Sequence, residues 1–257
     1  MKNIEAVIFD WAGTTIDYGC FAPVQAFLEV FRHYGIEPTM DEVRKPMGML
    51  KRDHIKTMLA MPRIHDLWAE TYGRNPEETD IDALYSIFEE KLMSILDRFA
   101  DVKPGVLETV AALREMGIKI GSTTGYTDEM MAVVVPKAAE NGYAPDAWFT
   151  PNAVGNAGRP YPYMIYRNME VLGVHSADQV VKVGDTISDI KEGKNAGIFT
   201  IGVVEGSSEM GVTKEEYEAM DAQEKAERTE KVKQSFLNAG ADAVIMNMGE
   251  LLDVLKK

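Results

Sequence analysis

The chain has 257 residues, of which 46% are apolar and 26% are charged, and these fractions are those of an ordinary globular protein. No apolar run approaches the roughly 20 residues that a membrane-spanning helix needs, so we do not expect a membrane protein. The net charge of −14 disfavours binding to a nucleic-acid backbone. The single cysteine, Cys20, excludes an internal disulfide and a zinc site of several thiolates, so any metal must be held by oxygen.

The first predicted element is a strand. Residues 4–9 are a short apolar run that ends at Asp10 and a Gly-Thr turn, as is typical of a buried strand. The run has no small-residue cleavage pattern after it, so we expect a cytoplasmic location rather than a signal peptide.

The pattern then becomes helical, and residues 21–100 contain no convincing strand. Thr39 and Glu42 form a capping-box pair that opens a helix, and Pro46-Met47-Gly48 interrupts the helical pattern. Helical spacing resumes at residue 50, so Lys51 falls in a first helical turn. Further helices are expected at residues 21–31, 50–61 and 81–99.

After Pro104-Gly105 helices alternate with strands, which predicts a parallel sheet covered on both faces. Helices are expected at residues 106–116, 128–140, 161–172, 188–196 and 249–255, and strands at residues 118–123, 147–150, 179–183, 199–204 and 243–246. Residues 205–240 are strongly charged, so we expect a solvated helical elaboration there. The sequence therefore predicts a doubly wound α/β core of residues 1–17 and 101–257, with an inserted helical cap of residues 18–100.

Polar side chains follow three of these strands. Asp10, the pair Thr123-Thr124 and the pair Gly184-Asp185 all come at carboxyl ends, where ligands collect in an open parallel sheet. The segments Asp10-Trp-Ala-Gly-Thr14, Thr-Thr-Gly at 123–125 and Gly184-Asp-Thr-Ile-Ser-Asp189 together resemble the haloacid dehalogenase superfamily of aspartyl-phosphate phosphohydrolases. The resemblance implies a Rossmann-like core of this superfamily.

This resemblance assigns Asp10 as the nucleophile, which suits a carboxylate that attacks phosphorus and forms an acyl phosphate. It also implies a Mg²⁺ ion held by Asp10, the backbone carbonyl of Ala12, Asp185 and Asp189. The last two carboxylates are one helical turn apart and offer the hard oxygen ligands that Mg²⁺ requires. Asp10 as a turn carboxylate, and Asp185 or Asp189 as helix caps, are the structural alternatives.

Three further residues match the phosphoryl-binding positions of the superfamily. Thr124 matches the hydroxyl that holds a phosphoryl oxygen, and the backbone of Gly125 offers an amide donor. Arg159 matches the cation of the third motif, where most relatives have lysine, and a guanidinium can fork onto two oxygens. A surface arginine is the alternative for Arg159.

One position departs from the superfamily pattern. Where ordinary phosphatases carry a second Asp that protonates the leaving group, this chain has Ala12. The stretch from Arg44 to His54 closely resembles the phosphonoacetaldehyde hydrolase family, in which a cap lysine forms an imine with the substrate aldehyde. The resemblance implies that Lys51 forms this imine, and that the carbon–phosphorus bond breaks to give acetaldehyde and phosphate. The protonated imine accepts the electrons that would otherwise form a carbanion.

An imine-forming lysine must be partly neutral. The helix N-terminus, cationic neighbours such as Arg52 and sequestration where the cap meets the core all favour the neutral form of Lys51, while a solvated helix lysine is the alternative. His54 lies three residues further on the same helix face and is expected to shuttle protons or to pack against a neighbouring helix. Met47 and Gly48 are expected to shape a small substrate pocket, although Met47 is equally compatible with a core position. Cys20 and Tyr126 lie beside motif residues and are expected to line the site.

Two other functions compete with this interpretation. A phosphate-ester phosphatase or phosphosugar mutase on the same core expects an Asp at the position of Ala12, and a non-catalytic phosphometabolite binder expects no turnover.

The family resemblance further implies a small phosphonate substrate and a homodimer formed through the cap. Because Asp10 and Lys51 belong to different parts of the chain, we expect closure about the linkers at residues 16–21 and 100–103.

Overall fold

The computed structural model describes residues 3–256, and its centre is one six-stranded sheet in which every pairing is parallel. The strands lie in the order β3-β2-β1-β4-β5-β6, so the strand order reverses beside β1. The strands are β1 Ala6–Phe9, β2 Lys119–Thr123, β3 Ala147–Phe149, β4 Val180–Gly184, β5 Phe199–Val203 and β6 Ala243–Ile245. Each predicted strand is present, with bounds that shift by at most two residues.

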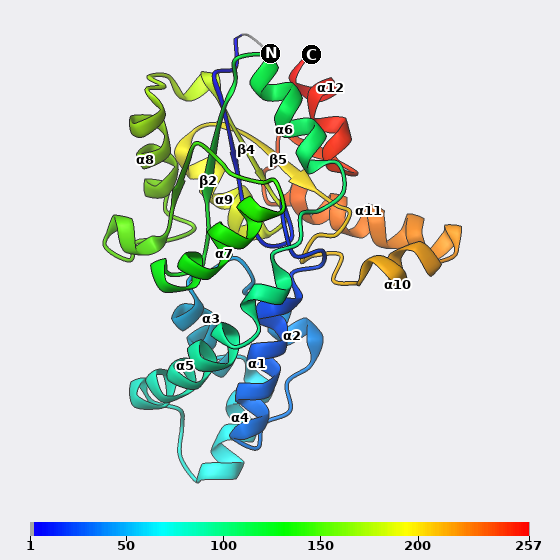
Figure 1. Cartoon of the computed structure of the whole chain (residues 1–257). Coiled ribbons are helices and arrows are strands. Elements are labelled where there is room, and N and C mark those ends of the chain that lie inside the picture. The colour runs from blue at the N-terminus through cyan, green and yellow to red at the C-terminus, as the bar shows by residue number, and fades with distance from the viewer. Residues whose placement is uncertain (1–2, 257) are drawn as a thin grey trace.

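Alternate residues of β1 pack on opposite faces of the sheet, as the two-residue period of a strand requires. Val7 and Phe9 pack with buried residues of α6, α7 and α12, whereas Ala6 and Ile8 pack with residues of α8 and α9. These helices are α6 Val106–Glu115, α7 Asp128–Glu140, α8 Tyr163–Leu172, α9 Ile187–Ala196 and α12 Leu251–Leu255. The doubly wound α/β fold is therefore confirmed (Figure 1).

A second group of helices lies beyond the sheet edge, in the lower half of Figure 1. It consists of α1 Phe21–His33, α2 Met40–Arg44, α3 Lys51–Leu59, α4 Pro62–Tyr72, α5 Glu78–Met93 and the short 3₁₀ turn Leu96–Phe99. None of residues 21–99, all of which the structure describes, lies in a strand. Helix α4 was not predicted, and the helix expected at 81–99 begins earlier and ends at Met93. The exact domain boundaries at 17/18 and 100/101 stay a prediction.

The two linkers between the sheet and these helices lie side by side. Ile16 and Val102 form an antiparallel bridge, and the Lys103 N–H donates to the Thr15 carbonyl at 2.9 Å. Asp17 then caps the first helix, because its carboxylate accepts from the backbone N–H groups of Phe21 and Ala22, each at 3.0 Å. The two linkers are therefore bonded to each other, and Asp17 fixes the residue at which α1 begins.

The segment at 205–240 is helical where expected, in α10 Lys214–Ala219 and α11 Ala222–Asn238, which project to the right in Figure 1. The expectation of a solvated segment is wrong for its first part. Residues 206–212 form a loop in which Ser207, Ser208 and Val212 are buried, and Val232 and Phe236 of α11 are buried as well. The high charge content of residues 205–240 gave no sign that some of them contact the core.

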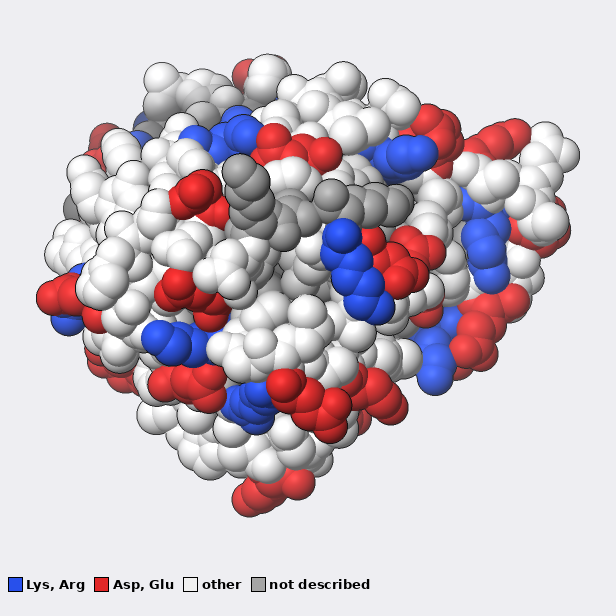
Figure 2. Space-filling model, turned by 90° about the horizontal axis from the view of Figure 1, so that it is seen from above, with Lys and Arg blue, Asp and Glu red and all other residues white. Residues whose placement is uncertain are grey.

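Basic side chains lie among acidic ones on the molecular face seen in Figure 2. No helix among the described residues is both long and apolar enough to cross a membrane.

The stacked rings inside the helical group generate a stability prediction. Phe27 is fully buried and stacks on Phe88 and His54, with ring centroids 4.2 Å and 3.8 Å away. We expect Phe27→Ala to lower the free energy of unfolding by about 3–5 kcal/mol, because the cavity cannot refill. The measurement is urea unfolding followed by circular dichroism. Val171→Ala, at a side chain that is 57% exposed, is the control and should stay within about 0.5 kcal/mol of wild type. A loss below 1 kcal/mol for Phe27→Ala would contradict the prediction.

Candidate active site

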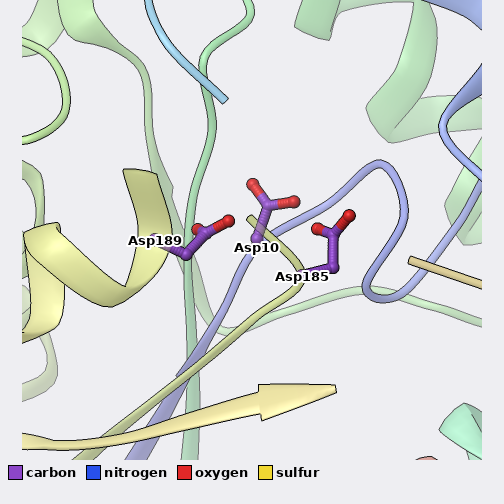
Figure 3. Close-up of side chains that lie close together, drawn as sticks. All are labelled: Asp10, Asp185 and Asp189. Carbon is purple, nitrogen blue, oxygen red and sulfur yellow. The ribbon is translucent and has the colours of Figure 1, made fainter. Parts of the chain in front are cut away.

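Three carboxylates meet at the carboxyl edge of the sheet (Figure 3). Asp10 follows β1, Asp185 follows β4, and Asp189 lies in the first turn of α9. One oxygen of each lies within 4.8 Å of the others, and all three residues are buried. The structure therefore brings together the three acidic residues that the sequence selected as metal ligands. A donor set of buried oxygens fits a hard divalent cation.

These carboxylates differ in their electrostatic surroundings. Burial raises the pKa of Asp10 and of Asp185, and the neighbouring acids add to the increase. Burial alone would raise the pKa of Asp189 as well, but Arg159 and Lys182 outweigh it and hold that pKa below its ordinary value. Asp185, which forms no ion pair with any described residue, is thus the carboxyl whose negative charge is least compensated, and a bound cation would relieve this.

Neighbouring groups hold Asp185 in place. The Thr14 hydroxyl donates to its Oδ1 and the Ser208 N–H donates to its Oδ2, each at 2.8 Å. Gly13 passes so close that a Cβ there would lie 2.1 Å from Asp185 Oδ2, and its φ of +89° also favours glycine. The turn after the nucleophile position therefore depends on glycine for its close contact with Asp185.

Arg159 lies in the interior of the site, so the alternative of a surface arginine is wrong. Its Nη2 donates to Asp10 Oδ1 at 2.6 Å, its Nη1 lies 3.1 Å from Asp189, and its Nε donates to Glu192 at 3.0 Å. The guanidinium is therefore fixed in one orientation, with one edge toward Asp10.

Lys182 and Glu192 are part of this cluster, and sequence reasoning missed both. Lys182 Nζ lies 3.0 Å from Asp189 and 3.2 Å from Glu192, and it donates to the Thr123 hydroxyl at 2.8 Å. A signal was present, because a lysine inside the apolar strand Val-Val-Lys-Val-Gly must be buried and therefore needs an anionic partner.

Thr124 and Gly125 lie in the same cavity as Asp10. The Thr124 hydroxyl accepts the Tyr126 N–H at 3.0 Å, which leaves its own proton free to donate to a ligand. A Cβ on Gly125 would lie only 2.9 Å from the Met49 carbonyl, so this glycine lets the two backbones approach closely.

Lys51 begins α3 and is only 3% exposed, so the alternative of a solvated lysine is wrong. It lines the same cavity as Asp10, and its Nζ lies 5.1 Å from the centre of the Tyr126 ring. Burial lowers its pKa below the ordinary value of 10.5, with Arg159 contributing to the decrease. Cys20 also lines this cavity, and burial raises the pKa of its thiol.

Met47 and Gly48, which precede α3, also line this cavity. The Ser188 hydroxyl donates to the Met47 carbonyl at 3.1 Å. Gly48 has a φ of +83°, and a Cβ there would lie 2.4 Å from the Thr186 hydroxyl. The enclosed volume is about 20 Å³, which holds about one water molecule. Residues of the helical group and of the sheet edge therefore line one small cavity.

His54 follows Lys51 by three residues in α3 and is not among the residues that line this cavity. Its ring is fully buried against Phe27, and its Nε2 lies 2.8 Å from the Val43 carbonyl. Burial and the nearby Lys51 hold its pKa well below 6.5. These contacts match the packing alternative, and the proton-shuttle role stays a prediction.

Comparison with known proteins identifies the family. Residues 4–197 match the family model of haloacid dehalogenase-like hydrolase. Phosphonoacetaldehyde hydrolase of Bacillus cereus is 53% identical over 254 residues, which cover 99% of this chain and 96% of that protein. The bifunctional phosphonoacetaldehyde hydrolase/aminoethylphosphonate transaminase of Clostridioides difficile is 52% identical over 256 residues, which span the whole of this chain but 40% of that longer protein.

Solved structures agree with these sequence comparisons. A phosphonoacetaldehyde hydrolase-like protein from Oleispira antarctica superposes with a TM-score of 0.95 at 38% identity, over 98% of this chain and 91% of that one. A putative beta-phosphoglucomutase from Thermotoga maritima, at 22% identity and a TM-score of 0.60 over 98% and 99% of the two chains, shares the fold. The chain therefore belongs to the haloacid dehalogenase-like hydrolases and, within them, to the phosphonoacetaldehyde hydrolase family.

Proposed function

We propose that this chain hydrolyses the carbon–phosphorus bond of phosphonoacetaldehyde to acetaldehyde and phosphate. Asp10 acts as the nucleophile and Lys51 as the imine-forming amine. The observation that carries the proposal is that these two side chains, from different parts of the chain, line one buried cavity.

The first step joins Lys51 to the substrate. The neutral amine attacks the aldehyde carbon, water leaves, and the imine nitrogen takes up one proton from solvent to become a protonated imine. Burial supports this step, because it lowers the pKa of Lys51 and so increases the neutral fraction at a given pH.

The second step breaks the carbon–phosphorus bond. The Asp10 carboxylate attacks phosphorus, and the bonding pair moves into the imine, which becomes an enamine on Lys51. Arg159, the Thr124 hydroxyl and the Gly125 N–H are the proposed donors to the phosphoryl oxygens. Arg159 suits this role because Glu192 and the Thr123 carbonyl already fix its orientation. Protonation and hydrolysis of the enamine release acetaldehyde, and water cleaves the aspartyl phosphate.

We further propose that Asp10, the Ala12 carbonyl, Asp185 and Asp189 hold Mg²⁺. In the buried cluster Asp10, Asp189 and Glu192 pair with Arg159 or Lys182, whereas Asp185 accepts from the Thr14 hydroxyl and the Ser208 N–H, so a divalent ion would chiefly balance the charge of Asp185. Bound there, Mg²⁺ would reduce the repulsion between a carboxylate and an approaching phosphonate.

We propose that the cap opens for substrate to enter, since the cavity has room for about one water molecule. We therefore propose that the linkers at residues 16–21 and 100–103 act as the hinge. The cytoplasmic location and the homodimer through the cap stay predictions from the sequence.

A phosphate-ester phosphatase is the competing function. It is disfavoured because Ala12 offers no proton to a leaving alkoxide, whereas imine chemistry needs no acid at that position. Identities of 52–53% to phosphonoacetaldehyde hydrolases also favour the carbon–phosphorus reaction.

Borohydride trapping tests the imine. Reduction in the presence of phosphonoacetaldehyde should attach the substrate-derived carbon chain to Lys51, as mapped by mass spectrometry. Lys51→Arg should lose turnover by at least about 10³-fold and lose the adduct, while Lys56→Arg, at an exposed lysine of the same helix, should keep both. Asp10→Asn should still form the adduct but release no phosphate. Normal turnover by Lys51→Arg would exclude the imine mechanism.

The lowered pKa of Lys51 predicts a pH profile. Only the neutral amine attacks an aldehyde, so the trapping rate should rise as pH passes upward through the pKa of Lys51 and then reach a plateau. The midpoint of this rise should come below pH 10.5, the ordinary lysine value. The measurement is the initial trapping rate against pH, with free Nα-acetyl-lysine as the reference. Coincident midpoints for enzyme and free lysine would show that burial does not activate Lys51.

Metal binding should depend on Asp185. Asp185→Asn removes a carboxylate whose charge the protein compensates poorly, so the Kd for Mg²⁺ should rise at least tenfold, as measured by titration calorimetry without substrate. Asp178→Asn, at an exposed carboxylate before β4, is the matched control and should bind as wild type does. An unchanged Kd for Asp185→Asn would remove this residue from the proposed ligand set.

A further inference from the structure

Arg44 is the last residue of α2, and it joins three parts of the chain. Its Nη1 donates to the Gly19 carbonyl in the first linker at 2.9 Å and to the Ser208 carbonyl in the core loop at 3.1 Å. One charged nitrogen therefore bonds the cap, the linker and the core together. Hydrogen bonds from a charged donor are about twice as strong as neutral ones.

The guanidinium of Arg44 is packed between neighbouring groups, while its Nε and Nη2 have no hydrogen-bond partner among the described residues. The guanidinium carbon lies 4.9 Å from the centre of the Phe21 ring, which favours a cation over its face. On the other side, Gly211 adopts a φ of +66°, and a Cβ there would lie 3.0 Å from Arg44 Nε. The linker and the core loop are also bonded directly, because the Gly19 N–H donates to the Gly206 carbonyl at 2.8 Å. The guanidinium thus occupies a slot between an aromatic ring and a glycine.

The core loop that receives Arg44 also holds Asp185. Ser208 accepts from Arg44 through its carbonyl, and its own N–H donates to Asp185 Oδ2 at 2.8 Å. Ser208 is 2% exposed, so water has little access to either bond. A displacement of Ser208 would therefore change the position of a carboxylate in the acidic cluster.

The segment that follows Arg44 leads directly to Lys51. The Ser188 hydroxyl donates to the Met47 carbonyl, so this segment is bonded to the core at Arg44 and again three residues later. Beside Arg44 lies a cavity of about 520 Å³ between α2, α11 and residues 209–211, which gives the guanidinium space to leave its slot when the cap opens.

We propose that Arg44 is a positioning residue that latches the closed cap and couples closure to the placement of Asp185. When the guanidinium bonds Ser208, the cap loop holds Lys51 in the cavity and the core loop holds Asp185 among the metal ligands. The coupling is reciprocal, so a metal ion at the acidic cluster favours closure by the same factor by which closure favours the ion. The effect on turnover rests on the proposed reaction and the effect on Mg²⁺ affinity on the proposed metal site, whereas the effect on hydrogen exchange rests on neither.

The test compares Arg44→Met with wild type in the absence of substrate. Mg²⁺ titration calorimetry should show a Kd raised at least fivefold, and hydrogen exchange at residues 206–210 should be faster. With phosphonoacetaldehyde, kcat/KM should fall at least tenfold, mainly through KM, because saturating substrate restores closure. A purely structural role would lower the melting temperature without changing the Kd of the folded enzyme.

Two further variants complete the design. Arg63→Met is the control, because Arg63 is an exposed arginine of the cap that pairs with Glu42 of α2 and should leave all three readouts unchanged. Arg44→Lys keeps the charge, but its compact, strongly hydrated ammonium replaces the planar guanidinium beside the Phe21 ring, so its Kd and exchange should lie between those of wild type and Arg44→Met. This variant also serves if Arg44→Met does not fold.

Wild-type Mg²⁺ affinity and wild-type exchange in a folded Arg44→Met or Arg44→Lys protein would overturn the proposal. If wild type failed to cleave phosphonoacetaldehyde, the proposed function would fail, but the calorimetry and exchange would still decide whether the latch exists.

Discussion

The ion pair between Arg159 and Asp10 is the interaction on which the rest of the site depends. Burying a carboxylate without a partner is costly, and here a guanidinium 2.6 Å away compensates it inside the sheet edge. Arg159 in turn needs Glu192 and Asp189, and these need Lys182. The cluster therefore behaves as one unit, in which removal of any member leaves an uncompensated buried charge. Such a site is rigid before a ligand arrives, and rigid donors are what stabilise developing charge efficiently.

Much of this site could be predicted from the sequence, because topology alone brings strand ends together. Asp10 and Asp185 follow neighbouring parallel strands, and Asp189 is one helical turn further along, so their meeting required no knowledge of side-chain packing. The break at Gly48 allowed Lys51 to be placed in a first helical turn. Its burial between the cap and the core could not be predicted from the sequence of that helix alone.

The residues that escaped prediction are those whose role depends on orientation. Lys182 and Glu192 matter only because a strand face and a helix face point at the same carboxylates, and a periodic pattern does not show which face that is. His54 shares a helix face with Lys51, yet it contacts Val43 and Phe27, because the rotation of α3 is set by packing in the cap. Ser208 lies in the strongly charged segment 205–240, and this charge gave no sign that Ser208 is buried. Helix α4 carries Ile64, Leu67 and Trp68 at helical spacing, so a signal for this helix was present in the sequence and was missed.

At Gly125 the cap and the core touch through their main chains. A Cβ there would lie 2.9 Å from the Met49 carbonyl oxygen and 3.1 Å from that of Gly48, so peptide groups of the two halves lie within van der Waals distance. Any side chain at position 125 would therefore act as a spacer between the two halves, even with every other residue unchanged.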